Sequence, residues 1–515
     1  MKSLADSQLD EQTQAQPDAG AAAECDSGAD VARNAAAKRP LPGGAGRGSG
    51  IDMTEGSIAR LLIRFALPLL LGNVFQQTYS IIDGIVVGNF ARNPVLCQAA
   101  VGASSQITNM LTSLFNGIGV GATIVIAQRY GARDKEGIKR AIDTIMAAVV
   151  VVAVPLMVIG YVAAGPLMRL LDMPADAMAD SITFMRVIFL GILASLGYNI
   201  ISGIFQGIGD TRRPLYFLMF ANVLNIVLDL ITVIGFHLDV LGVAISTVTA
   251  QYSILILSIL YINRKKLFFK ISFRKIMFDL ASLKDSVVIG LPAGLQNMVF
   301  SAGTLVIQSL INSYGDAFIA GATNASKIDV LSFMPNVCFA SAVTTFVGQN
   351  IGAGKFDRIN KGIRTGMWMS IVLSIALAVI ILPVAPFVLG LFNPDKQVVT
   401  YGLDYLHRAM PFYWVNSIVF IFNSALRGMG SSIVPMASSM ISLWIARVPL
   451  AYVFANLFGG PNLYLSYVFG WLIGIAISGG YYATGKWKKI ARRRFEMAQA
   501  AAKKDAEAKE AADTG

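Results

Sequence analysis

The feature that most constrains this chain is a series of apolar blocks, each about twenty residues long. A helix needs about 20 residues to cross a hydrocarbon core about 30 Å thick. Hydrophobic residues make up 55% of the chain and charged residues only 14%, so we predict an all-α polytopic membrane protein. The predicted spans are 60–88, 100–127, 139–164, 182–206, 214–236, 240–262, 285–312, 322–347, 362–390, 401–426, 434–457 and 463–485.

The two ends of the chain differ in composition from the apolar blocks. Residues 1–50 are rich in Ala, Gly, Asp and Gln, and they are expected to form a disordered tail without the apolar segment of a signal peptide. Residues 486–515 begin with a basic stretch, which predicts a charged, solvated helix resting against anionic headgroups. Membrane lipids are therefore expected partners, and a segment that binds another protein is the alternative.

Lys and Arg, which give the chain its net charge of +11, are concentrated on alternate connections. They lie at 129–140, 212–213, 263–284, 355–364 and 427. The opposite connections hold only Arg92, Arg169 and Lys396. Because basic connections stay in the cytoplasm, we predict a multi-pass protein of the cell membrane with both termini cytoplasmic. The positive charge is thus a topology signal, and nucleic-acid binding is not expected.

Motifs of enzymes and metal sites are absent from the sequence. The cysteines Cys25, Cys97 and Cys338 have no CxxC spacing, and the two histidines form no HExxH motif. We therefore predict no enzyme activity, no resident metal and no organic cofactor.

Similar segments recur in the two halves of the chain. "RFALPLLLGNVFQQ" faces "VIGLPAGLQNMVFS", "ATIVIAQRYGARDKEGI" faces "VTTFVGQNIGAGKFDRI", and "FQGIGDTRRP" faces "LRGMGSSIVP". Among the paired residues, 221 to 224 positions apart, are Pro68 and Pro292, Asn73 and Asn297, Gln128 and Gln349, Gly131 and Gly352, and Gly207 and Gly428. The constant order and spacing predict two copies of a six-helix unit.

Six crossings return the chain to its starting side, so the two copies have the same orientation. Such a parallel repeat predicts two lobes related by a pseudo-two-fold axis along the membrane normal, with a central cavity between lobes that rock. The expected domains are an N-lobe at 51–262, a basic cytoplasmic linker at 263–284 and a C-lobe at 285–485.

The first predicted span carries a polar stripe. Asn73, Gln76, Gln77, Ser80 and Asp83 share one helical face, which must point into the protein because lipid cannot satisfy polar groups. Amides and hydroxyls of this kind also bond helix to helix. A carboxylate buried in a span usually marks an ion pathway or proton relay, so Asp83 is the candidate for a functional role.

The fifth and sixth spans supply further oxygen groups. Asn222, Asn225 and Asp229 share a face of the fifth span, and Thr247 lies early in the sixth. Together with Asp83, these groups suit either one small hard cation or a shared proton. The sequence leaves H⁺ and Na⁺ open.

The second half does not repeat these acids. It carries instead Lys327 and Asp329, which do not share a helical face, together with Arg408 and Arg447. Snorkelling to the interface is expected for Arg408, whereas Arg447 lies deeper in its span. Coupling chemistry is therefore expected in the first lobe alone.

The motifs together resemble those of the multidrug and toxic compound extrusion (MATE) family, in its DNA-damage-inducible protein F-like branch. The similarity runs from Ile58 to Tyr482 and includes "PLLLGNVFQQTYSIIDGIVVG", "GATIVIAQRYGA", "NVLNIVLD", "GVAIST" and "RVPLAY". It implies twelve helices in two lobes, and export of cationic or amphipathic small molecules in exchange for H⁺ or Na⁺.

The resemblance also implies roles for particular residues. The family's first-lobe cation site carries over to Asp83, Asn225, Asp229 and Thr247, the last three within "NVLNIVLD" and "GVAIST". Residues 287–311 lack the seventh-span acid of other branches, so a Na⁺ site in the second lobe is not expected. Gln76, Tyr79 and Asn297 are candidate substrate contacts from their place on inward stripes. A monomer is expected.

Two other functions fit parts of the sequence. A flippase for lipid-linked saccharides predicts a basic cavity, for which Lys327, Arg408 and Arg447 are candidates, although the two first-lobe acids oppose it. A channel or membrane scaffold would lack coupling altogether. Uphill transport in proteoliposomes separates these classes.

Overall fold

The computed structural model describes residues 50–90, 94–170, 174–265, 267, 269–271 and 279–514. These residues all belong to one compact unit, Leu41–Gly515, and their regular structure is helical throughout. The predicted tail therefore lies outside the described residues except for Gly50, as do residues 266, 268 and 272–278 of the predicted linker.

The first six predicted spans correspond to one group of helices, which we call the N-lobe. Its elements are α2 (Ile58–Phe90), α3 (Pro94–Gly131), α4 (Lys135–Leu170), α5 (Ala175–Leu190), α6 (Ile192–Gly207), α7 (Arg212–Asp229), the π-helix η1 (Leu230–Gly235) and α8 (Asp239–Arg264). The fourth span consists of α5 and α6, which are bent by 45° at Gly191. The fifth consists of α7 and η1.

The last six predicted spans form the C-lobe. Its elements are α9 (Leu280–Asn312), α10 (Asp316–Gly352), α11 (Phe356–Phe392), α12 (Lys396–Ala409), η2 (Met410–Phe412), α13 (Tyr413–Gly428), α14 (Ile433–Met440), the π-helix η3 (Ile441–Arg447), α15 (Val448–Phe458), η4 (Gly460–Tyr464) and α16 (Leu465–Ala483). The terminal helix α17 (Lys486–Thr514) follows.

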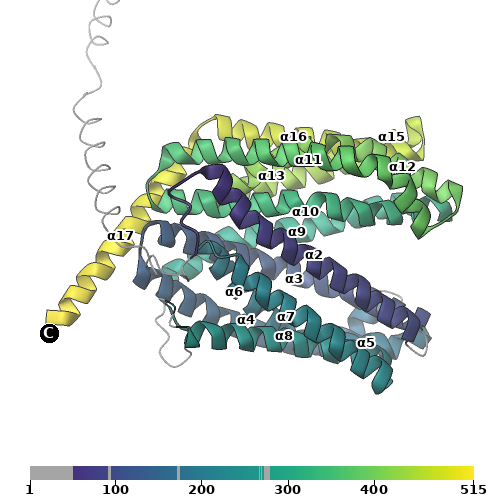
Figure 1. Ribbon diagram of the computed structural model, residues 1–515, viewed down its shortest axis with the longest axis horizontal. Coiled ribbons are helices and arrows are strands. Elements are labelled where there is room, and N and C mark those ends of the chain that lie inside the picture. The colour runs from purple at the N-terminus through teal and green to yellow at the C-terminus, as the bar shows by residue number, and fades with distance from the viewer. Residues whose placement is uncertain are drawn as a thin grey trace, which may run out of the picture. The chain divides into compact units, whose positions relative to one another are not determined.

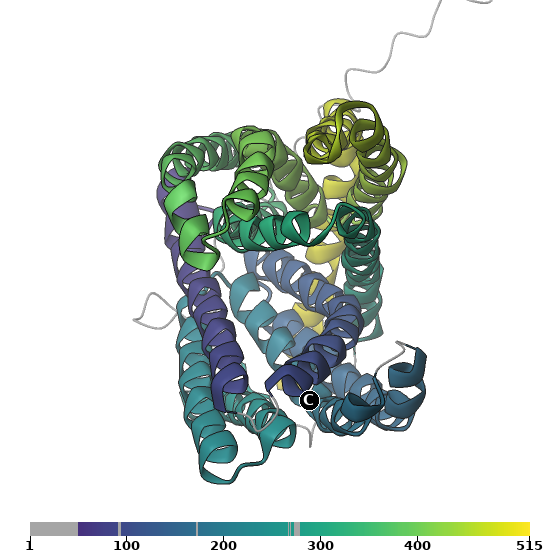
Figure 2. The same ribbon diagram turned by 90° about the vertical axis from the view of Figure 1, so that its right-hand side faces the viewer.

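Each lobe has its own hydrophobic core. Phe189, Phe205 and Ile204 belong to a buried cluster of the N-lobe, and Tyr405 and Tyr464 belong to one of the C-lobe. In Figure 2 most helices coloured purple to teal lie in the lower part of the view and most helices coloured green to yellow lie in the upper part.

The outer helix faces are apolar. Val151 and Val162 on α4 are 71% and 68% exposed, and Val379 and Phe387 on α11 are 67% and 68% exposed. Among the described residues, ten helices are long and apolar enough to cross a membrane, and the bent pair α5 and α6 makes eleven. The 38-residue helix α3 occupies the remaining predicted span. Exposed aliphatic faces of this length suit contact with lipid.

The lobes meet tightly at one end of the bundle, where α3 and α10 end (Figure 1). A Cβ added to Gly131 would lie 1.9 Å from the backbone oxygen of Gln349, and one added to Gly352 would lie 1.8 Å from that of Gln128. Only glycine permits backbones to approach so closely. Since the internal repeat pairs Gly131 with Gly352 and Gln128 with Gln349, the contact is symmetric.

Hydrogen bonds between the lobes repeat the same symmetry. The Gln128 Nε2 donates to the Gly428 oxygen at 3.2 Å, and the Gln349 Nε2 donates to the Gly207 oxygen at 3.0 Å. The repeat also pairs Gly207 with Gly428. Both amides are buried, so these bonds replace water that the closed lobes exclude.

A short segment before α2 ties the lobes together at this end. The Ile51 N–H donates to the Gly209 oxygen of the N-lobe at 3.1 Å. The Met53 N–H donates to the Gln349 Oε1 at 2.9 Å, and the Asn350 Nδ2 donates to the Met53 oxygen at 3.1 Å. The Met53 side chain is fully buried. We call residues 51–56 the strap.

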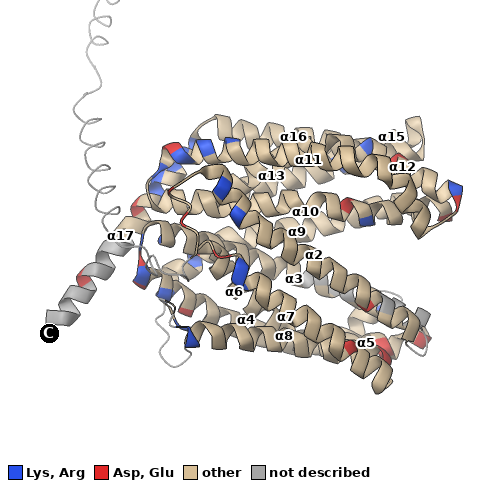
Figure 3. Ribbon diagram, viewed as in Figure 1, with Lys and Arg blue, Asp and Glu red and all other residues tan. Residues whose placement is uncertain are grey.

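Lys and Arg residues gather at this closed end, where α17 leaves the bundle (Figure 3). Arg133 and Lys355 both pair with Glu55 of the strap. We call this region the basic end. This clustering of Lys and Arg at one end agrees with their concentration on alternate connections in the sequence.

Candidate functional site

The N-lobe encloses a polar cavity of about 460 Å³. Four of the seven predicted site residues line it: Gln76 and Tyr79 from α2, Asn225 from α7 and Thr247 from α8. Its wall also includes Asn116, Asn199 and Gln251. None of the lining residues is charged, so the cavity surface is rich in amides and hydroxyls.

The predicted acids lie behind this wall. Asp83 follows Tyr79 by one turn of α2, and Asp229 follows Asn225 by one turn of α7. The two carboxyl groups are close enough to interact directly. The Tyr79 hydroxyl contacts Thr247 and is near both acids. The structure thus brings Asp83, Asn225, Asp229 and Thr247 together around Tyr79.

The acids are poorly satisfied by the surrounding protein. Asp229 is 1% exposed and Asn225 is 4% exposed. Within the described residues, the Asp83 Oδ1 and both Asp229 oxygens are buried without a hydrogen-bond partner of ordinary geometry. Buried carboxylates are costly unless they are paired, hydrogen-bonded or neutralised. The arrangement therefore favours a bound positive ion, either a proton or a small hard cation.

Local backbone structure places Asp229 at a helical irregularity. The π-helix η1 begins directly after Asp229, and π-helical turns occur frequently at functional sites. Within η1, Thr232 lies 3.0 Å from the Ser246 hydroxyl of α8, and Ser246 in turn is close to Asp229. Sequence reasoning missed Ser246, although it directly precedes Thr247.

Asn73 of the predicted stripe also lines the N-lobe cavity. Its Nδ2 donates to the Cys338 Sγ of α10 at 3.4 Å, which is a contact between the lobes. Gln77 and Ser80 are not among the residues that line the cavity. Asn297 lines a different cavity from Gln76 and Tyr79.

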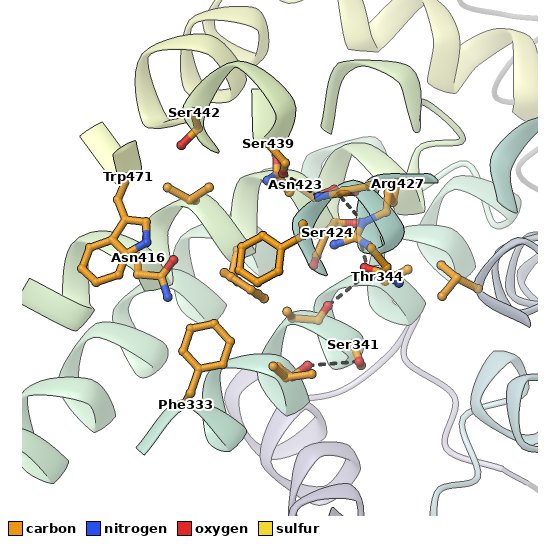
Figure 4. Close-up of a pocket in the computed structure, with 18 of the residues that line it drawn as sticks. Phe333, Ser341, Thr344, Asn416, Asn423, Ser424, Arg427, Ser439, Ser442 and Trp471 are labelled. Atoms are coloured by element: carbon orange, nitrogen blue, oxygen red, sulfur yellow. Dashed lines mark hydrogen bonds between the residues drawn. The ribbon is translucent and has the colours of Figure 1, made fainter. Parts of the chain in front are cut away.

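The second cavity, of about 440 Å³, lies mainly in the C-lobe. Its wall contains Phe333, Phe420 and Trp471 together with the amides Asn416 and Asn423 (Figure 4). It also contains two arginines, Arg427 of α13 and Arg447 of η3. The two cavities thus differ in charge.

The other charged residues of the C-lobe lie away from this wall. Lys327 is exposed, and its Nζ lies 5.0 Å from the centroid of the Phe392 ring. The Asp329 Oδ2 accepts a hydrogen bond from the Tyr405 hydroxyl at 2.8 Å. Arg408 pairs with Asp404 and donates from its Nε to the Asn462 Oδ1 at 3.1 Å.

Sequence reasoning counted Arg427 with the basic connections and missed its place on the cavity wall. The signal was present in the internal repeat. "FQGIGDTRRP" and "LRGMGSSIVP" place Arg427 opposite Gln206, and Gln206 lines both cavities. A residue at the same position of the other lobe was therefore a candidate wall residue.

Comparison with known proteins finds one family in both halves of the chain. The MatE family profile matches residues 68–231 and 292–453. One match lies in each lobe. The matches begin at Pro68 and Pro292, which the internal repeat pairs with each other.

Bacterial relatives are similar over most of the chain. It is 30% identical over 445 residues to the probable multidrug resistance protein YpnP of Bacillus subtilis, which covers 85% of this chain and 98% of the relative. It is 26% identical over 450 residues to the probable multidrug resistance protein NorM of Thermotoga maritima, with 84% and 94% covered.

Solved structures share the fold. A MATE protein crystallised in complex with MaL6 has a TM-score of 0.80 at 23% identity, with 85% of this chain and 99% of the other covered. A multidrug resistance MATE family transporter in its outward-facing conformation has a TM-score of 0.79 at 23% identity, with 86% and 98% covered. The predicted all-α fold of twelve helices in two lobes is confirmed.

Proposed function

The chain belongs to the MatE family of multidrug and toxic compound extrusion transporters, whose members are not enzymes, and from this premise we propose secondary active efflux by antiport. The substrates are lipophilic or cationic small molecules. The coupling ion is H⁺ or Na⁺, and the DNA-damage-inducible protein F-like branch is compatible with this proposal.

The observation that carries the proposal is the pair of carboxyls behind the N-lobe cavity, of which Asp229 is buried and Asp83 is half-buried. Asp83 and Asp229 interact with each other, and three of their oxygens have no hydrogen-bond partner of ordinary geometry among the described residues. Two like charges in a low dielectric favour uptake of a positive ion. Asn225 and Thr247 add an amide and a hydroxyl oxygen, which suit Na⁺ as well.

Exchange of cations is energetically balanced across a charged membrane. Exporting one positive charge from a cell that is negative inside costs about 2.3 kcal/mol per 100 mV, and an entering H⁺ or Na⁺ returns the same amount. One-for-one exchange therefore leaves the concentration gradients to set the direction of transport.

Coupling requires that the ion and the substrate prefer different arrangements of the lobes. In this structure the lobes are held together at the basic end, which the positive-inside rule assigns to the cytoplasm. We infer that this arrangement faces outward. Ion binding at Asp83 and Asp229 then repacks the N-lobe around η1 and weakens substrate binding in the outward-facing cavity.

The same rule gives the proposed location. The protein is a multi-pass protein of the cell membrane, with both termini cytoplasmic and lipids around its exposed aliphatic faces. It functions as a monomer, because each chain carries both lobes and both cavities.

The proposal is tested with Asp83→Asn and Asp229→Asn in reconstituted vesicles. Asparagine keeps the size of the side chain but cannot exchange a proton, so gradient-driven dye efflux is expected to fall about tenfold or more in each variant. H⁺ and Na⁺ gradients are imposed separately. The gradient that drives efflux in the wild type identifies the coupling ion.

The matched control is Asp180→Asn, which changes an exposed acid on α5 and should leave efflux unchanged. Undiminished gradient-driven efflux in both the Asp83→Asn and the Asp229→Asn variant would end the coupling proposal. Wild-type vesicles that only dissipate gradients would instead indicate a channel. The comparisons offer no support for the saccharide flippase.

A further inference from the structure

A third cavity, of about 290 Å³, opens where the two lobes meet and is separate from both polar cavities. Its walls come from α3, α4 and α6 of the N-lobe and from α9 of the C-lobe, and they include Phe115, Val149, Ile200 and Val287. Among its described lining residues, only Ser286 has a polar side chain. We call this cavity the seam groove.

Small residues keep the seam groove open. On α4 it is lined by Ala147 and Ala148, whose side chains are too short to fill it. Beside it, α3 and α9 touch backbone to backbone, since a Cβ added to Gly121 of α3 would lie 2.1 Å from the Ser286 oxygen of α9. The groove thus has one wall on each lobe, and it depends on the close approach of α3 and α9.

The rim of the seam groove is exposed along membrane-spanning helices. Val151 of α4 and Val287 of α9 line the groove and are exposed, and Val288 and Leu291 continue the exposed face of α9. Faces of this kind contact hydrocarbon. The volume lies below the range of about 300–1,000 Å³ that holds a drug-sized ligand, so the groove suits a single acyl chain better than a whole compound.

A lysine lies at the end of the groove that is nearest to the basic end. Lys284 directly follows the lining residue Leu283 in the second turn of α9, is exposed and forms no ion pair within the described residues. The neighbouring acids Asp279 and Asp285 are already paired with arginines, at 2.8 and 2.6 Å. A lysine at the cytoplasmic surface attracts anionic headgroups, so the charge beside the groove complements a phospholipid with net negative charge.

We propose that the seam groove binds one acyl chain of an anionic phospholipid, with Lys284 beside the headgroup phosphate. The chain packs on both lobes, so its binding stabilises the arrangement in which the basic end is closed. The inference goes beyond the proposed efflux function and takes from it only the cytoplasmic position of the basic end.

Lipid that merely covers the outer helix faces is the competing explanation. Bilayer chains are already in apolar surroundings, so burial alone gives no preference for this groove. Covering lipid predicts that no single side chain affects the first lipid bound. A built site predicts that filling the groove weakens every phospholipid, whereas removing the charge weakens only the anionic ones.

Binding of the first phospholipid to the detergent-purified, full-length protein is measured by native mass spectrometry. The probes are phosphatidylglycerol and phosphatidylcholine that carry the same acyl chains. Ala148→Trp fills the groove and is expected to weaken both lipids about fivefold or more, because the chain loses its packing contacts. Lys284→Gln is expected to weaken phosphatidylglycerol about fivefold and phosphatidylcholine less than about twofold.

Further variants separate these results from misfolding. Val287→Trp fills the groove from the other lobe and should reproduce the effect of Ala148→Trp. The matched controls are Val158→Trp, which changes an exposed residue of α4 outside the groove, and Lys396→Gln, which changes an exposed lysine at the start of α12. Neither control should alter either affinity.

Gly131→Ala tests the link between the lipid and the lobes. Its added Cβ would lie 1.9 Å from the backbone oxygen of Gln349, so the lobes must shift apart, and the groove loses the spacing of its walls. Phosphatidylglycerol binding should weaken about threefold or more, because a ligand that favours one arrangement binds the other less tightly. Gly165→Ala, which meets no atom within 4 Å, should leave binding unchanged.

Several outcomes overturn the inference. They are unchanged lipid affinity in both tryptophan variants, equal losses of the two lipids in Lys284→Gln, and undiminished phosphatidylglycerol binding in Gly131→Ala. Displacement of the lipid by the dye rhodamine 6G would assign the groove to a substrate, and a dimer that the tryptophan variants abolish would assign it to a second copy of the chain. The efflux proposal is judged separately by gradient-driven dye efflux of the wild type, which does not depend on the result.

Discussion

At the scale of single residues, one carboxylate outside the spans links the two lobes. Asp279 caps the start of α9 by accepting hydrogen bonds from the backbone N–H groups of Ala281 and Ser282 at 3.1 and 3.2 Å. Its other oxygen accepts from Arg129 of α3 at 2.8 Å and from the Ser282 hydroxyl at 2.7 Å. The residue thus serves both as a helix cap and as an inter-lobe ion pair.

The pKa of Asp279 follows from these contacts. Burial alone would raise it, but the hydrogen bonds from Ser282 and the positive charges of Arg129 and Arg140 hold the pKa of Asp279 below its ordinary value. A carboxyl with a lowered pKa stabilises the fold above its unfolded-state pKa of about 4. That stabilisation is lost as the pH falls below this value.

We expect Asp279→Ala to lower stability by about 1–2 kcal/mol at pH 7, the usual effect of removing a helix N-cap. The measurement is the thermal unfolding midpoint of the detergent-purified protein. The difference from wild type should shrink as the pH falls below about 4, since the wild-type carboxyl is then protonated. A difference that grows on acidification would contradict the assignment, and Asp316→Ala, which changes an exposed acid in the first turn of α10, is the control.

At the scale of elements, helices occupy the predicted spans. Several of these spans, however, contain bends or irregular turns that the continuous apolar blocks do not indicate. The bend at Gly191 and the break at η2 divide single predicted spans. The π-helix η3 ends two residues before Pro449. A proline ring clashes with the backbone carbonyl four residues earlier and lacks the N–H that would bond to it, so the regular α-helical pattern is broken there. Pro411 likewise lies inside η2. The sequence therefore indicates an irregularity at these two prolines, whereas the π-helix η1 contains no proline that would predict it.

The symmetric glycine contacts between α3 and α10 give a second prediction. Alanine at Gly131 or Gly352 cannot fit, because its Cβ would lie within 2 Å of a backbone oxygen of the other lobe, at 1.9 and 1.8 Å respectively. Each substitution should therefore separate the lobes at the basic end.

The separation can be measured with spin labels on the exposed residues Lys135 and Lys361, in protein without native cysteines, by pulsed electron resonance. Gly131→Ala and Gly352→Ala should shift the distance distribution toward longer values. Gly165→Ala is the control, because no atom lies within 4 Å of the added Cβ. Unchanged distributions in both interface variants would show that the contact does not hold the lobes together.

At the scale of the whole molecule, the proposed transport cycle requires the lobes to separate at the basic end. The contacts there are extensive, since the strap, the reciprocal Gln128 and Gln349 bonds and the Arg129 pair with Asp279 all join the lobes. The alternating access that we propose would break these contacts once in each cycle. A covalent link across them should stop transport.

The pair Ala127→Cys and Gly348→Cys tests this requirement. A Cβ on Gly348 would lie 2.9 Å from that of Ala127, close enough for a disulfide after a small adjustment. Oxidation should abolish dye efflux in vesicles, and reduction should restore it.

The matched control is a disulfide within the C-lobe. Ser374 of α11 and Ser417 of α13 have hydroxyl oxygens 2.7 Å apart, and cysteines at these positions should leave efflux intact when oxidised. Full efflux with the Ala127 and Gly348 positions cross-linked would show that the lobes do not need to part here.

The sequence alone determined the spans, the duplication and the residues that face inward. Apolar length sets how many helices can cross a bilayer, and helical periodicity sets which side chains share a face. Asp83 and Asp229 could therefore be named as inward-facing acids, and the twelve-helix fold in two lobes could be predicted and is confirmed.

The tertiary structure alone decided which faces meet. Periodicity orients a side chain relative to its own helix but does not choose its neighbour, so the approach of Gln349 to Gly207 and the place of Arg427 on a cavity wall depend on how the helices pack. The closed basic end was equally beyond sequence reasoning. The same helices serve every arrangement of the lobes, and only the contacts between them distinguish one arrangement from another.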